Sequence, residues 1–201
     1  MIPKNIQLIL ASASPRRSEL LRQMGEIFKI IPANCNETLQ LNLTIAENAT
    51  LLAKKKAEFV AAKIDEAALI IGADTLVSVD GNILGQPQNR EQSAQMLSQL
   101  SGKSHEVTTG VCIIGKEPKY FQNFCVTTKV VFNTLTREEI EAYIDTKEPM
   151  DKAGSYAIQG KAAVFVKEIH GDYYNVVGLP LSRLYEELKR YNEFWKTKNN
   201  K

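Results

Sequence analysis

The sequence lacks the marks of several large protein classes. It has only three cysteines in 201 residues, and Cys35, Cys112 and Cys125 form no CxxC pair. This excludes a disulfide framework and a zinc knuckle and favours a reducing compartment. The N-terminal apolar run Ile6 to Ala11 is too short to span a bilayer, and it leads into Arg16 and Arg17 rather than a cleavage site. We therefore expect a cytoplasmic protein with no membrane partner.

An excess of charge of one sign is also lacking. The 25 basic and 23 acidic residues give a formal net charge of +2, and the two signs are interleaved along the chain. No nucleic-acid partner is expected, and small anionic substrates fit better. The 11 glycines and 7 prolines are too few for a low-complexity region. We expect a single domain over residues 1–195, followed by a polar C-terminal tail over residues 196–201.

Periodicity and capping signals divide the chain into helices and strands. Strands are expected at 6–11, 28–32, 69–71, 105–114, 123–132 and 162–169, with a hairpin over 76–83; helices are expected at 15–24, 44–64, 89–100, 180–191 and from 136 onward. Helices and strands alternate in the first part, and a strand-rich stretch follows. This order predicts an α/β fold with a mixed sheet, flanking helices and a cleft rather than a simple doubly wound sheet.

The turn Ser12-Ala13-Ser14-Pro15-Arg16-Arg17 is the first candidate binding site. It joins the first strand to the first helix, with Ser14 as N-cap candidate and proline at the first helical position. Unpaired N–H groups and the helix dipole favour an anion at such a helix start, and two guanidinium groups add to this. The alternative is an ordinary capped helix with two solvated arginines.

A lysine on a buried helix face is the second signal. At about 100° per residue, Lys56 lies about 20° from Ile45 within the apolar stripe of the 44–64 helix, whereas Lys54 lies on the opposite face. Either the Lys56 side chain extends past the core to water, or it points into an anion-binding cleft.

Acidic residues supply the third signal. Asp74 follows the apolar run Leu69 to Ala73, so we expect its carboxylate just past the end of a strand, a common place for a metal ligand or a general base. A capping or turn hydrogen bond is the alternative. Glu37 lies in a polar loop and is a second candidate. Magnesium often takes only one or two protein carboxylates together with substrate phosphates, so Asp74 and Glu37 would suffice as ligands.

Five sequence blocks together carry a resemblance to a known family. They are Leu10 to Leu21, Gly72-Ala73-Asp74-Thr75, Ser101 to His105, Asp151 to Gly160 and Val176-Val177-Gly178-Leu179-Pro180. In this order they resemble the Maf family of nucleoside triphosphate pyrophosphatases over almost the whole chain. The resemblance implies a two-lobed α/β fold around a central cleft, related to inosine triphosphate pyrophosphatases. It also implies hydrolysis of a metal-bound nucleoside triphosphate to the monophosphate and pyrophosphate.

The resemblance assigns roles to individual residues. It implies that Asp74 is the catalytic proton acceptor, that Glu37 and Lys56 belong to the active site, and that Glu37 and Asp74 hold a divalent cation, Mg²⁺ or Mn²⁺. The residues implied to contact substrate are Ser12, Ser14, Arg16, Arg17, Thr75, Gln86 and Gln159. Arg16, Thr75 and Gln159 are similar to the branch that acts on dTTP and UTP. A homodimer is expected from the resemblance alone.

Two positions depart from the family pattern. Gln86 stands where the family usually has lysine, and Asn36 stands where it usually has an acidic residue. Glutamine donates only a neutral hydrogen bond, which predicts a slower enzyme. The alternative function is a nucleotide-sensing or partner-binding regulator of cell division with little or no turnover. RNA binding through Arg16 and Arg17 is less favoured, because no aromatic stacking platform accompanies them.

Overall fold

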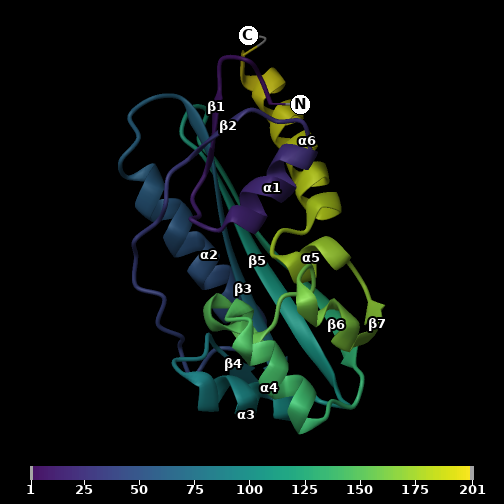
Figure 1. Ribbon diagram of the computed structural model, residues 1–201. Coiled ribbons are helices and arrows are strands. Elements are labelled where there is room, and N and C mark those ends of the chain that lie inside the picture. The colour runs from purple at the N-terminus through teal and green to yellow at the C-terminus, as the bar shows by residue number, and fades with distance from the viewer. Residues whose placement is uncertain (1, 200–201) are drawn as a thin grey trace. The chain divides into compact units, whose positions relative to one another are not determined.

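The computed structural model describes residues 2–199. The helices are α1 Pro15–Gln23, α2 Ile45–Ala61, α3 Arg90–Leu100, α4 Arg137–Asp145, α5 Tyr173–Val177 and α6 Leu181–Asn199 (Figure 1). The strands are β1 Gln7–Leu10, β2 Phe28–Ile30, β3 Ala68–Val79, β4 Asn82–Leu84, β5 Ser104–Gly115, β6 Tyr120–Phe132 and β7 Val166–His170. Three short 3₁₀ helices, η1 Glu148–Asp151, η2 Ala153–Ser155 and η3 Lys161–Phe165, lie between α4 and β7. Across residues 2–199, no helix combines the length and apolar character needed to cross a bilayer.

The strands form one mixed sheet, as the sequence predicts. Its order is β2-β1-β3-β5-β6-β7, and β4 pairs with β3. The pairs β1–β2 and β1–β3 are parallel, whereas β3–β4 and β6–β7 are antiparallel. The parallel part follows the alternation of strands and helices at the start of the chain. The antiparallel part follows the strand-rich stretch, where the β3–β4 hairpin turns at Asp80 and Gly81, both with positive φ.

The chain divides into two compact units. Unit 1 comprises Met1–Asp74, Thr109–Val126 and Gly178–Lys201, and unit 2 comprises Thr75–Thr108 and Thr127–Val177. The strands β3, β5 and β6 therefore each contribute residues to both units.

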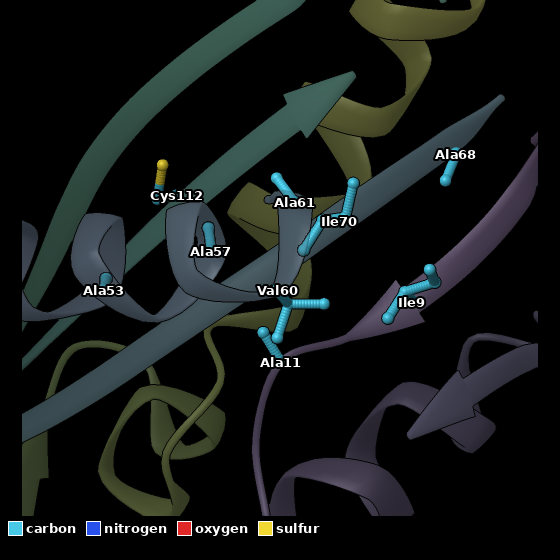
Figure 2. Packing of buried hydrophobic residues seen from close by; sticks show 9 residues of the cluster. All are labelled: Ile9, Ala11, Ala53, Ala57, Val60, Ala61, Ala68, Ile70 and Cys112. Atoms are coloured by element: carbon cyan, nitrogen blue, oxygen red, sulfur yellow. The ribbon is translucent and has the colours of Figure 1, made fainter. Parts of the chain in front are cut away.

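Helix α2 packs closely on the sheet of unit 1 because glycine and alanine leave room for it. A Cβ at Gly72 of β3 would lie 2.3 Å from the Ala53 carbonyl oxygen, and one at Gly110 of β5 would lie 2.2 Å from that of Ala49. Only glycine permits so close an approach of helix and strand backbones. Figure 2 shows the cluster beneath, in which Ala53, Ala57, Val60 and Ala61 of α2 lie with residues of β1, β3 and β5.

Local capping signals place the helix starts correctly. Thr44 and Glu47 form a complete capping box at α2, and Thr136 and Glu139 form another at α4. The Asn89 side chain accepts the N–H of Gln92 at the start of α3. These predicted helix starts are confirmed.

Three expectations differ from the structure. The strand expected at 69–71 does not end before Asp74, because β3 continues from Ala68 to Val79 and Asp74 lies within it. The strand expected at 162–169 begins only at Val166, since residues 161–165 form η3. The predicted tail 196–201 is helical as far as Asn199, and its last two residues lie outside the described residues.

Candidate functional site

A buried ion pair lies at the centre of the candidate site in unit 1. Residues 70, 72 and 74 alternate onto one face of β3, where Ile70 packs against α2 and Gly72 lets that helix approach. Asp74 thus faces α2, and Lys56 Nζ of that helix lies 2.6 Å from Asp74 Oδ1. Both side chains are only 9% exposed. The prediction that Lys56 lies on the buried face of its helix is confirmed, while the Lys54 side chain is 41% exposed.

Glu37 joins this pair from a loop. Its Oε2 atom lies 2.8 Å from Lys56 Nζ, so one ammonium bridges two carboxylates, although the Glu37 side chain is half exposed. The loop is shaped locally by Asn36, whose side-chain oxygen accepts the backbone N–H of Thr38 at 2.8 Å. Asn36, one of the two departures from the family pattern, thus shapes this loop with an uncharged side chain. Because Glu37 lies in a loop, no helix or strand periodicity in the sequence predicts its contact with Lys56.

The donor set fits a hard divalent cation that also binds substrate phosphates. Glu37 and Asp74 each place a carboxylate oxygen against Lys56 Nζ, so the two carboxylates lie near one another, and oxygen ligands are what Mg²⁺ prefers. Residues 2–199 hold no group of three or more histidine, cysteine, aspartate or glutamate side chains suited to a metal ion. A cation at this place would therefore take most of its remaining ligands from substrate and water.

The turn between β1 and α1 forms a second polar cluster in unit 1. Ser12 is buried, and its Oγ accepts the Ser14 N–H at 3.2 Å and Arg17 Nη1–H at 3.3 Å. Ser14 occupies the N-cap position as predicted, but its hydroxyl makes no capping hydrogen bond. Pro15 opens α1 at the first helical position, which confirms the predicted strand-turn-helix.

Arg17 links this turn to a distant segment. Its Nε–H donates to the Gly178 carbonyl oxygen at 2.8 Å, across 161 residues of sequence. Sequence reasoning assigned no role to that carbonyl, although the block Val176 to Pro180 carried part of the resemblance. The hydrogen bonds fix the guanidinium plane at the base of the turn.

Arg17 also belongs to the electrostatic environment of the carboxylates. Desolvation lowers the pKa of Arg17 below its ordinary value, and the positive charge of Arg16 lowers it further. The negative charges of Asp74 and Glu37 raise the pKa and offset part of this effect, with Asp74 the stronger of the two. Arg17 remains protonated at neutral pH, because arginine titrates far above it. The structure thus brings Arg16, Arg17, Lys56, Glu37 and Asp74 into one electrostatic group.

The other predicted substrate contacts belong to unit 2. Thr75 directly follows Asp74 in β3. Gln86 is exposed, and its Nε2–H donates to the Asp151 carbonyl oxygen at 3.3 Å. Gln159 is exposed within a turn closed by a hydrogen bond from the Gly160 N–H to the Ala157 carbonyl oxygen at 2.9 Å. Sequence reasoning did not single out the residues that hold this turn, Tyr143 and Glu148.

Comparisons with known proteins show the family and the fold of this chain. A protein named dTTP/UTP pyrophosphatase from Bacillus velezensis is 50% identical over 186 residues, which cover 92% of this chain and 97% of that protein. One of the same name from Carboxydothermus hydrogenoformans is also 50% identical, covering 92% and 99%. The solved structure of a HAM1 protein from Coxiella burnetii is 14% identical in sequence and shares the fold, with a TM-score of 0.50. The match covers 92% of this chain and 99% of that chain. The family model described as Maf-like protein matches residues 7–191, and the chain therefore belongs to the Maf-like family.

Proposed function

We propose that this protein hydrolyses dTTP and UTP, and related pyrimidine nucleoside triphosphates, to the monophosphate and pyrophosphate. The observation that carries the proposal is the Lys56 ammonium bridging Asp74 and Glu37, beside the Arg17 guanidinium. Two relatives that are half identical over most of their length bear the name dTTP/UTP pyrophosphatase, which supports this choice of substrate.

In this mechanism Asp74 accepts a proton from the attacking water. Lys56 donates a hydrogen bond to Oδ1, and the other carboxylate oxygen, Oδ2, receives the proton. The water attacks the α-phosphorus, its new P–O bond forms as the bond to the bridging oxygen breaks, and pyrophosphate leaves. Catalysis of this kind depends mainly on positioning and on charge stabilisation.

The cationic and hydroxyl groups of the β1–α1 turn bind phosphate in this scheme. Arg16 and Arg17 neutralise the charge that grows on the leaving pyrophosphate, while Ser12 and Ser14 present hydroxyl groups at the start of α1. Glu37 and Asp74 would hold Mg²⁺ or Mn²⁺. The cation would supply further charge neutralisation on the phosphates.

We propose that hydrogen-bonding side chains recognise the base of the substrate. Gln159 and Thr75 offer hydrogen-bonding groups for the base, and Gln86 offers a neutral donor to the phosphates. We further propose a cytoplasmic location, in keeping with three free cysteines.

The test is pyrophosphate release from dTTP, UTP, dCTP, dGTP and ATP, each with Mg²⁺, with Mn²⁺ and with a chelator. We expect dTTP and UTP to be hydrolysed fastest, and Asp74→Asn to lower kcat at least about 100-fold, the usual worth of a general base. Asp65→Asn is the matched control, since Asp65 is an exposed aspartate before β3. Full activity in Asp74→Asn would refute the mechanism. Tight triphosphate binding without turnover by the unaltered chain would favour the nucleotide-sensing alternative.

A further inference from the structure

The turn that carries Gln159 is held from both sides. Ile158, one position earlier, is only 7% exposed, so the turn is fixed to the core of unit 2, while Gln159 itself is exposed. A carboxamide offers one acceptor and two donor hydrogens, which complement the carbonyl oxygen and N3–H of thymine or uracil. Such recognition depends on the carboxamide being held in one place, because each freely rotating group loses entropy on binding.

Glu148 supplies the main restraint on this turn. Its Oε1 and Oε2 atoms both accept the Lys161 N–H, at 3.0 and 3.2 Å, just after the turn. A Cβ at Gly160 would lie 2.2 Å from Glu148 Oε1, so the carboxylate packs directly against the Gly160 backbone. The residue after Gln159 therefore has to be glycine for Glu148 to reach the chain.

Tyr143 supplies the second restraint and fixes Glu148. The Tyr143 hydroxyl donates to Glu148 Oε1 at 2.8 Å and accepts the Ala157 N–H, on the near side of the turn, at 3.2 Å. Tyr143 is 4% exposed, and its ring packs edge-on against Phe165, with ring centroids 5.2 Å apart. One buried hydroxyl and one carboxylate thus accept the backbone N–H groups at the two ends of the Gln159 turn and hold it in place.

We propose that Glu148 and Tyr143 are positioning residues for the pyrimidine base: they hold the Gln159 turn through the Ala157 and Lys161 N–H groups. They act on binding of the base and not on the chemistry at phosphorus. This inference rests on the proposed function, in which Gln159 contacts the base.

The first experiment compares Glu148→Ala with the matched control Glu138→Ala, an exposed glutamate of α4. Losing a charge-assisted hydrogen bond at the turn is expected to raise KM for dTTP and UTP roughly tenfold, with kcat within about threefold. The preference for dTTP over dGTP is expected to fall by a similar factor. Glu148→Gln keeps one acceptor oxygen and is expected to recover part of the loss. Unfolding midpoints are measured for each variant.

The second experiment tests whether Glu148 acts through Gln159. In a double-mutant cycle, adding Glu148→Ala to Gln159→Ala is expected to cause little further rise in KM, because the group being positioned is already gone. Tyr143→Phe removes only the hydroxyl and is expected to show a smaller rise in KM of the same kind. Amide hydrogen exchange at Ala157 and Lys161 is expected to quicken in Glu148→Ala and not in Glu138→Ala.

The outcomes separate this inference from the proposed function. If the unaltered chain hydrolyses dTTP and UTP but Glu148→Ala keeps the same KM and the same preference over dGTP, the inference is wrong and the proposed function stands. Additive effects of Glu148→Ala and Gln159→Ala would also overturn it. If the unaltered chain releases no pyrophosphate from any nucleotide, the proposed function fails and the inference fails with it.

Discussion

Replacing Lys56 by methionine removes the ammonium that joins Asp74 to Glu37 while keeping a long unbranched side chain in α2. The loss leaves the Asp74 carboxylate, 9% exposed, without the partner 2.6 Å away. Breaking a buried ion pair by removing one partner costs about 3 to 5 kcal/mol. Arg17 still attracts Asp74, and the half-exposed Glu37 carboxylate can turn to water. We therefore expect a destabilisation of about 3 kcal/mol, at the lower end of that range.

The control is Lys54→Met, the same substitution two residues away. Lys54 makes an exposed ion pair with Glu58 one helical turn on, at 3.6 Å. Exposed pairs of this spacing contribute only about 0.3 to 0.5 kcal/mol. The two variants therefore share composition, charge change and helix, and differ in which face of α2 they alter.

The measurement is urea unfolding at pH 7 followed by circular dichroism. Lys56→Met should shift the transition to lower urea, and Lys54→Met should leave it nearly unchanged. Adding Asp74→Asn to Lys56→Met should recover part of the loss, since no buried charge is then left without a partner. Equal midpoints for the two lysine variants would refute the account of Lys56 as one partner of a buried ion pair.

Three further predictions follow from the packing, titration and charge of other groups. Gly72→Ala places a Cβ 2.3 Å from a carbonyl oxygen of α2. We therefore expect urea unfolding to show a loss of about 1 to 3 kcal/mol in the free energy of unfolding, together with lower pyrophosphatase activity. Gly85→Ala is the control, because a Cβ there meets open space and the substitution should be close to neutral. Burial lowers the pKa of His105 to about 4, so the unfolded chain binds that proton more readily and stability falls as the pH drops from about 6.5 to 4. The full effect is about 3 kcal/mol, and His105→Gln should flatten this part of the stability profile; the control is His170→Gln, at an exposed histidine. Gln86→Lys restores a charged donor and should raise kcat/KM for dTTP about tenfold, the difference between charged and neutral hydrogen bonds; an unchanged value would mean that glutamine is no defect.

Local signals in the sequence predicted most of the secondary structure. The capping boxes at Thr44 and Thr136 depend only on residues three positions apart, and the structure contains both. The 100° periodicity of α2 placed Lys56 on the buried face and Lys54 on the exposed face, because a regular helix fixes the direction of each side chain. These features need no knowledge of the rest of the chain.

The boundary of β3 could not be predicted in the same way. Glycine and aspartate are uncommon within strands, so Gly72 and Asp74 indicated that the strand had ended. The structure gives a different reason for Gly72: a side chain there would collide with α2. The strand continues through Asp74 because tertiary packing outweighs the local preference.

The sequence by itself determined most of the helices and strands, the mixed sheet and the residue types available for phosphate chemistry. Only the tertiary structure decided which of these residues meet. Lys56 reaches Asp74 across 18 positions, and Arg17 reaches the Gly178 carbonyl across 161. Periodicity and capping arise from neighbours along the chain. Contacts between distant residues depend instead on how closely helix and strand backbones approach, and here that approach depends on a hydrogen atom in place of a side chain at Gly72.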